Sequence, residues 1–113
     1  MLDIHIDHLT NPRNIGIIKN ADLILETKSS QCDDTIKMYF KIDENKIITD
    51  VKYQVFGCWA VIVSASMMSE YIKGKNILDI KNITEEEMEK VFEYVHSVKE
   101  NCFYLIKEIF NQL

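Results

Sequence analysis

The chain contains few of the residues that break regular structure or favour an extended, coreless chain. It has three glycines and one proline in 113 residues, while 47% of the residues are hydrophobic and 27% are charged. This composition excludes fibrous and intrinsically disordered proteins and is typical of soluble globular ones. A chain of this length can form one hydrophobic core but not two, so we expect a single domain over residues 1–113.

An excess of positive charge and a long apolar run are also missing. The net charge is −5 and the charges are interspersed, so no basic stripe is present and we expect no nucleic-acid partner. The longest uncharged apolar stretch, residues 55–69, is too short to span a bilayer, and the first residues lack the cationic segment of a signal peptide. We therefore expect a cytoplasmic protein without membrane contact, as a monomer or weak homo-oligomer.

Three apolar runs predict β-strands. They cover residues 21–28, 35–43 and 46–56, and in the second run Ile36, Met38 and Phe40 alternate with Lys37, Tyr39 and Lys41. A period of two is typical of a half-buried strand, and the sequence DEN at 43–45 is typical of a hairpin turn. These patterns predict an α+β fold in which helices pack on one face of a three-stranded antiparallel sheet.

The second half of the chain predicts helices. Residues 59–72 are apolar almost all round, as in a helix buried against a sheet, and Gly74 follows in the usual capping position. Thr84 and Glu87 form the capping box of a second helix, and steps of three and four between residues 98 and 109 predict a last helix with one apolar face.

The first ten residues are predicted to be a short docking segment. Its apolar residues are Ile4, Ile6 and Leu9. Pro12 disfavours helical geometry at the residue before it, so a turn should follow. For His5 and His8, packing or simple exposure is the default interpretation, and for His96 we favour the surface.

The three cysteines have different expected surroundings, and their odd number argues against a disulfide framework. Cys102 lies on the apolar face of the last predicted helix, where burial explains it sufficiently. Cys58 starts the helix predicted at 59–72, where the helix dipole and unpaired amides favour a thiolate. Gly57 would let the backbone turn tightly there and leave the sulfur approachable. Cys32 lies in a polar junction between strands, where burial is not expected.

Together the cysteines suggest one metal site. Cys32, Cys58 and Cys102 would supply three soft ligands, and Asp34 would point to the same side as Cys32 in an extended segment. Three thiolates and a carboxylate suit zinc or an iron–sulfur cluster. Lys99, one helical turn before Cys102, would favour the thiolate form of that cysteine, although a solvated lysine explains it equally well.

Five segments in order along the chain form a more specific pattern: DHLTNPRNIG, QCDD, FGCWAVIVSAS, IKGK and VKENC. Together they resemble the IscU/NifU-N type of iron–sulfur cluster assembly scaffold, whose motifs run DHYxNPRNxG, CGD, FGCGxAIASSS, KGK and VKxHC. The resemblance extends from Asp7 to about Cys102, nearly the whole chain, with closely similar cysteine spacing. It implies an α+β fold of the SufE/NifU-like kind.

The resemblance also implies a function. A cysteine desulfurase would deliver sulfur, iron would join it, and a labile [2Fe–2S] cluster would be built and transferred to apo iron–sulfur proteins. By position, Cys32, Cys58 and Cys102 match the cluster-binding cysteines of the family. Asp34 matches the aspartate that favours cluster release, and Lys99 matches the lysine near the third cysteine. Cys58 and Cys102 would also accept sulfur. Zinc is the other expected occupant, and the chain would be a scaffold rather than an enzyme.

Three positions depart from the family pattern. Asp33 replaces a glycine, which adds a negative charge beside the first cysteine, and Trp59 replaces the glycine after the second. Asn101 replaces a histidine, and an amide binds iron or zinc poorly, so a fourth ligand must come from Asp34, solvent or His96. The family's proline-containing chaperone segment is EYVHS here, which counts against recognition by the dedicated Hsp70-type chaperone.

Two alternatives remain open. One is a zinc-bound persulfide carrier of the SufU type, although this chain lacks the insertion that such proteins carry between the second and third cysteines. The other is a zinc-stabilised interaction module without assembly activity, which Asp33 and Asn101 keep open.

Overall fold

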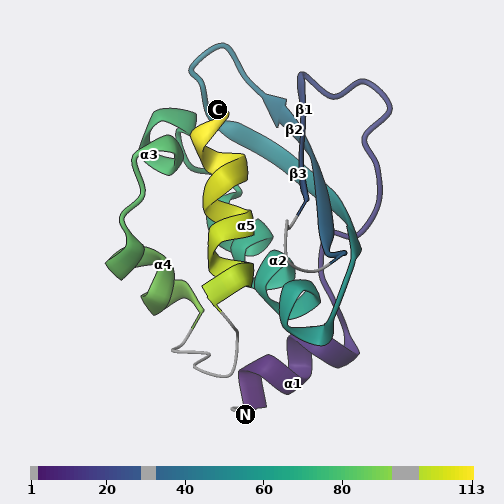
Figure 1. Ribbon diagram of the computed structural model, residues 1–113. Coiled ribbons are helices and arrows are strands. Elements are labelled where there is room, and N and C mark those ends of the chain that lie inside the picture. Colours follow the sequence, from purple (N-terminus) through teal and green to yellow (C-terminus); the bar gives the residue numbers. More distant parts are fainter. Residues whose placement is uncertain (1–2, 29–32, 93–99) are drawn as a thin grey trace.

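An antiparallel sheet forms one layer of the molecule, and α2 and α5 pack across one of its faces (Figure 1). The computed structural model describes residues 3–28, 33–92 and 100–113, the side chains of residues 100–104 excepted. The elements in chain order are α1 Asp3–Thr10, β1 Leu23–Lys28, β2 Thr35–Ile42, β3 Ile48–Phe56, α2 Trp59–Ile72, α3 Ile77–Lys81, α4 Glu85–Val91 and α5 Glu100–Asn111. The predicted α+β fold is confirmed.

The strands pair in the order β1-β2-β3, as the three apolar runs predict. Met38, at the centre of β2, pairs with Leu25 on β1 and with Tyr53 on β3, and all three side chains are buried. The strict alternation expected for β2 is broken at Tyr39, which lies on the opposite face and is also buried. Its hydroxyl donates a hydrogen bond to Gln54 on β3, so the tertiary structure satisfies this phenol away from water.

The turn between β2 and β3 follows the predicted hairpin chemistry. The Asp43 carboxylate accepts hydrogen bonds from the amides of Asn45 and Ile47, at 2.8 and 3.0 Å. Lys46 takes a positive φ of 68° at the tip, where a left-handed residue reverses the chain.

Helix α2 is buried on nearly all sides, as its uniform apolar pattern predicts. It ends at Ile72, and Gly74 follows with a φ of 90°, a conformation that glycine adopts without strain. The capping box of α4 is confirmed at its N-terminus, because Thr84 Oγ1 accepts the amide hydrogen of Glu87 at 3.1 Å.

The N-terminal docking segment is helical, and of the two interpretations left open for His5 and His8, packing or exposure, the structure shows packing. Ile4 and Ile6 are exposed, whereas His5 and His8 are buried. In a helix, positions three apart share a face, so α1 places the two imidazoles together against the rest of the protein. The helix ends at Thr10, before Pro12, as the sequence predicts.

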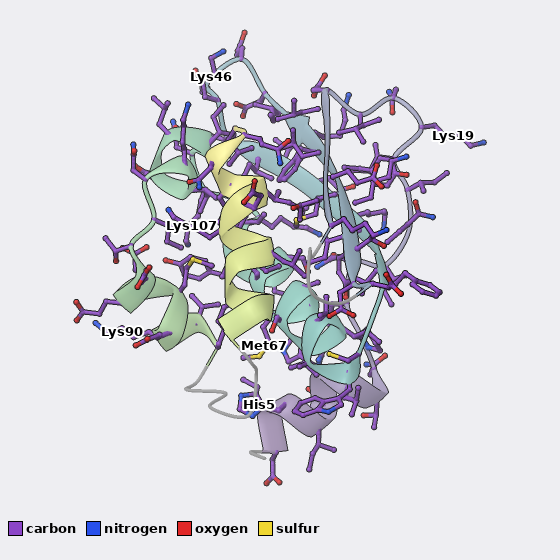
Figure 2. All side chains as sticks on the ribbon, in the orientation of Figure 1. His5, Lys19, Lys46, Met67, Lys90 and Lys107 are labelled. Atoms are coloured by element: carbon purple, nitrogen blue, oxygen red, sulfur yellow. The ribbon has the colours of Figure 1, made fainter. Side chains whose placement is uncertain are left out.

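Helix α5 packs against α2, α3 and the strands β1 and β2. Leu105, Ile106 and Ile109 are buried on one face of α5, as its steps of three and four predict. The five-residue helix α3 was not predicted, because it is too short to show a period. Lys107 Nζ donates a hydrogen bond to the Ile83 carbonyl and so ties α5 to the α3–α4 connection (Figure 2). Within the described ranges, every helix is too short or too polar to cross a membrane.

Candidate functional site

The end of the β2–β3 pair brings together two segments that lie far apart in the sequence. The last pair in the register is Thr35 with Phe56. One step further out, Asp34 precedes β2 and Gly57 follows β3, so these two residues meet at the end of the sheet. Helix α2 begins directly after this point, which places its N-terminus at the same end.

Asp34 and Cys58 are in direct contact there. The Cys58 amide donates a hydrogen bond to Asp34 Oδ1, with an N–O distance of 3.3 Å. Asp34 is buried, at 8% exposure, whereas Cys58 is an exposed free cysteine. The two candidate ligands therefore differ in access to solvent, because Cys58 is exposed and Asp34 is buried.

Cys58 is the N-cap residue of α2, with extended backbone angles of −75° and 169°. Its side chain makes no capping hydrogen bond within the described structure, so the sulfur is not engaged by the helix end. The first turn of α2 contains no acidic residue, and Asp34 is the carboxylate that reaches this helix end. The Cys58 side chain therefore lies at the positive end of the helix dipole.

The structure gives Gly57 a different role from the predicted one. The conformational freedom of glycine is required only at a positive φ, which among the described glycines is found at Gly16 and Gly74 but not at Gly57. Gly57 instead packs against Asp34: a Cβ atom at Gly57 would lie 2.5 Å from Asp34 Oδ1. Space, rather than backbone freedom, explains the absence of a side chain here. The sequence alone does not indicate this role, since the partner lies 23 positions away.

The departures from the family pattern are only partly described. Asp33 is exposed, next to the buried Asp34. Trp59, the first residue of α2, is partly buried and packs against the hydrophobic core. Asn101 and Cys102 lie in α5 by their backbone, but their side chains are outside the described part of the chain.

Three further candidates, Cys32, His96 and Lys99, lie outside the described residues altogether. Of the four predicted ligands, the structure therefore places Asp34 and Cys58 together and leaves the positions of Cys32 and Cys102 as predictions. Among the described side chains, no group of three or more His, Cys, Asp or Glu residues lies close enough to hold a metal ion.

The DHLTNPRNIG segment is joined to α2 by buried polar groups. Ser66 Oγ accepts the Arg13 amide hydrogen at 2.9 Å and lies 2.7 Å from His8 Nδ1. Asn14 Nδ2 donates a hydrogen bond to Ser69 Oγ at 3.0 Å. Burial, and then the nearby Arg13 guanidinium, lower the pKa of His8 below its usual value. These contacts give this part of the pattern a structural role.

The other buried histidine connects α1 to the end of α4. His5 Nε2 lies 2.8 Å from the carbonyl oxygen of Phe92, and His5 is labelled in Figure 2. The motif residues are evident in the sequence, but their partners are not. Serines in an otherwise apolar helix are the signal that could have indicated buried polar contacts on α2.

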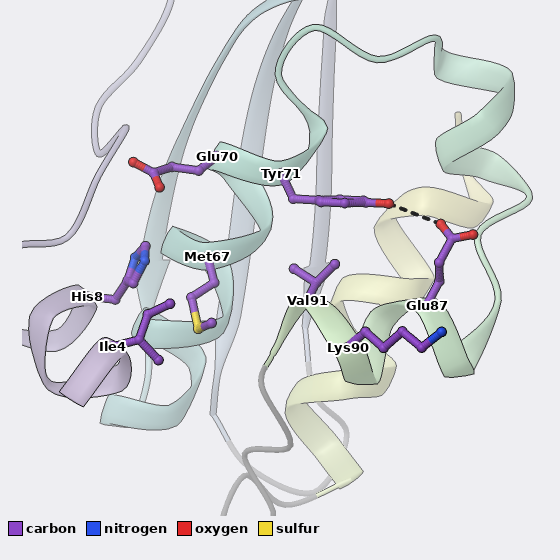
Figure 3. A pocket seen from close by; sticks show the side chains of 8 residues that line it. All are labelled: Ile4, His8, Met67, Glu70, Tyr71, Glu87, Lys90 and Val91. Carbon is purple, nitrogen blue, oxygen red and sulfur yellow. Dashed lines mark hydrogen bonds between the residues drawn. The ribbon is translucent and has the colours of Figure 1, made fainter. Parts of the chain in front are cut away.

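A cleft of about 540 Å³ lies between α1, α2 and α4, apart from Asp34 and Cys58 (Figure 3). Ile4, Met67 and Val91 form its apolar part. Its polar residues are His8, Glu70, Tyr71, Glu87 and Lys90. The Tyr71 hydroxyl donates a hydrogen bond to Glu87 across one side of the cleft, so these two groups already satisfy each other.

Comparison with known proteins identifies the family. Residues 3–112 match the sequence model described as the NifU-like N terminal domain. This chain belongs to the NifU-like N-terminal domain family. The match includes every candidate site residue from Cys32 to Cys102.

Individual relatives of this NifU-like domain agree with that assignment. It is 35% identical over 106 residues to the iron-sulfur cluster assembly scaffold protein IscU of Rickettsia prowazekii, covering 91% of this chain and 80% of the relative. It is 36% identical over 96 residues to the scaffold protein IscU 1 of Archaeoglobus fulgidus, covering 85% of this chain but 62% of that longer relative.

The fold of the NifU-like domain also matches a solved structure. The crystal structure of FiSufU from Fervidobacterium islandicum AW-1 superposes with a TM-score of 0.72 at 25% sequence identity. The match covers 99% of this chain and 94% of the other. Sequence and structure therefore place the chain in the same family.

Proposed function

We propose that this NifU-like domain is a scaffold on which a labile [2Fe–2S] cluster is assembled by Cys32, Cys58, Cys102 and Asp34 and then passed to apo-proteins. The observation that carries the proposal is the pairing of the buried Asp34 carboxylate with the exposed Cys58 thiol at the end of the sheet. Cys32 is two positions from Asp34 in the sequence. Membership of a family whose relatives are named as scaffolds supports the same function.

The ligand set suits a cargo that must leave again. Thiolates bind iron strongly, whereas a carboxylate is a harder oxygen ligand that holds a cluster less firmly. In the structure the Asp34 carboxylate already has a second use, since it accepts the Cys58 amide hydrogen. Competition between the amide and iron for this carboxylate would make the bond to the cluster easier to break.

The exposed Cys58 thiol also suits sulfur acceptance from a cysteine desulfurase. The Cys58 thiolate would attack the outer sulfur of a cysteine persulfide on the desulfurase. A new sulfur–sulfur bond would form on Cys58, the bond in the donor would break, and the donor cysteine would leave as a thiolate. In this function the desulfurase carries out the catalysis, and the present chain receives the product. Cys102 is the second candidate acceptor.

Anaerobic reconstitution tests the scaffold proposal. Purified protein is incubated with ferric iron and sulfide, so that two ferric ions and two sulfides give the cluster without a further oxidant, and cluster formation is followed by visible absorption together with iron and sulfide analysis. We expect a two-iron cluster on the wild type and little or none on Cys58→Ser. Because the carboxylate makes the cluster exchangeable, Asp34→Ala should slow its decay. Unchanged cluster formation on Cys58→Ser would contradict the proposal.

Asp33→Ala is the comparison for Asp34→Ala. It removes the same charge from the neighbouring, exposed position. Slower decay in both variants would assign the effect to the charge of the segment rather than to the Asp34 carboxylate.

A persulfide carrier of the SufU type is the second candidate, supported by the exposed Cys58 thiol. For this function, sulfur transferred from a desulfurase should be found covalently on Cys58 or Cys102 and should move to an acceptor without iron. Mass spectrometry of the protein after incubation with desulfurase and cysteine measures the added sulfur. Sulfur transfer without any cluster formation would favour the carrier.

A further inference from the structure

The space that a side chain at Gly57 would occupy is filled by Asp34. A Cβ atom at Gly57 would lie 2.5 Å from Asp34 Oδ1, 2.9 Å from Cγ and 3.1 Å from Cβ. Carbon atoms essentially never approach other side-chain atoms below 3.0 Å. The carboxylate can therefore adopt its position beside the Cys58 amide only while residue 57 has no side chain.

We propose that Gly57 is a positioning residue for Asp34: its missing side chain lets the carboxylate lie against the start of α2, where the Cys58 amide holds it next to the exposed thiol. This inference deepens the proposed scaffold function and rests on it for its consequence on the cluster. The positioning itself is a property of the protein without cargo, so it can be tested separately.

An alanine at position 57 should displace the carboxylate rather than disrupt the fold. The φ of Gly57 lies outside the left-handed region, so alanine can adopt the same backbone without strain. The two closest atoms, Oδ1 and Cγ of Asp34, move when the side chain rotates, and the contact with Asp34 Cβ at 3.1 Å needs a further shift of a few tenths of an ångström. Gly57→Ala should therefore break the hydrogen bond between Asp34 and Cys58, and it should resemble Asp34→Ala.

The first measurement uses the apo-protein. Hydrogen exchange at the Cys58 amide, followed by NMR, reports the bond to Asp34 directly. A hydrogen bond to a charged acceptor contributes enough that its loss should accelerate exchange about tenfold. We expect this acceleration in Gly57→Ala and in Asp34→Ala.

Gly74→Ala is the matched control. Gly74 has a positive φ and no atom within 4 Å of an added Cβ, and it lies at the other end of α2. This substitution introduces backbone strain and lowers the melting temperature, but it should leave exchange at the Cys58 amide unchanged.

The second measurement is cluster lifetime after anaerobic reconstitution. General damage to the site would shorten the lifetime, whereas displacement of Asp34 should lengthen it, as in Asp34→Ala. In the double variant Gly57→Ala/Asp34→Ala, the lifetime should match that of Asp34→Ala alone, because the carboxylate through which Gly57 acts is already gone.

The outcomes separate the two proposals. Unchanged amide exchange in Gly57→Ala, or a cluster that decays faster in this variant than in the wild type, would overturn the positioning role. If exchange accelerates as expected but no variant, including the wild type, forms a cluster, then Gly57 positions Asp34 and the scaffold function is wrong.

Discussion

Ser64 and Ser66 are buried hydroxyls two positions apart on α2, and replacing each with alanine should change stability very differently. Ser66 Oγ contacts His8 Nδ1 at 2.7 Å and accepts the Arg13 amide hydrogen at 2.9 Å. Ser64 Oγ is buried without a hydrogen-bond partner among the described residues. Ser66→Ala therefore leaves two groups of the N-terminal segment unsatisfied, whereas Ser64→Ala removes a hydroxyl that is itself unsatisfied.

The expected magnitudes follow from these contacts. An unsatisfied buried polar group costs about 1 to 3 kcal/mol, so two such groups cost about 2 to 6 kcal/mol. The contact of the Arg13 amide is only partly buried, so we expect Ser66→Ala to lower the free energy of unfolding by the lower part of this range, about 2 to 4 kcal/mol. For a chain of this size, a loss of about 3 kcal/mol corresponds to a decrease in melting temperature of roughly 10 °C. Ser64→Ala should change stability by less than about 1 kcal/mol, in either direction.

Thermal and urea unfolding, followed by circular dichroism, measure both variants. Cluster reconstitution at a temperature where Ser66→Ala is folded should be unaffected, because the contacts of Ser66 hold α1 and the NPRN turn rather than Asp34 or Cys58. Equal melting temperatures for the two variants would refute the role of the DHLTNPRNIG segment as a structural attachment to α2.

Two further predictions concern pH and the replaced histidine. Burial and then Arg13 lower the pKa of His8 below 6.5, so the unfolded chain binds a proton that the folded one does not. The free energy of unfolding should therefore fall as the pH decreases from about 6.5 toward the pKa of His8 in the folded state. Urea unfolding over this pH range should show a weaker dependence of stability on pH for His8→Asn than for the wild type. The same pH dependence in both proteins would contradict the lowered pKa of His8. Asn101→His should strengthen zinc retention beside Cys102, because an imidazole replaces an amide that binds zinc poorly. Competition for zinc with a chromophoric chelator measures this change. Weaker zinc binding by the variant than by the wild type would mean that residue 101 points away from the site.

Much of the fold could be predicted because its signals are local. The alternation of Ile36, Met38 and Phe40 reports a strand within a few residues, and Thr84 marks a helix start by its own hydrogen bond to Glu87. Gly74 marks a helix end because a single residue there needs a positive φ. Each signal depends on neighbours in the sequence, so no knowledge of the tertiary structure is needed to read it.

The N-terminal segment shows where such patterns fail. The pattern left packing or exposure open for His5 and His8, and the structure buries both, whereas the apolar Ile4 and Ile6 are exposed. An imidazole can be buried when a partner meets its ring nitrogen, and the partners here are Phe92 and Ser66, far along the chain. Burial of a polar side chain depends on what the tertiary structure places opposite it.

Some properties of the candidate site also follow from the sequence, and others follow only from the tertiary structure. By itself the sequence determined the residue types, three cysteines and an aspartate in a family pattern, because ligand chemistry belongs to the side chains themselves. Only the tertiary structure decided that Asp34 is buried, that Cys58 is exposed, and that Gly57 must lack a side chain. These properties arise where the end of β3 meets the start of β2, and strand pairing joins residues whose separation in the chain conceals their contact.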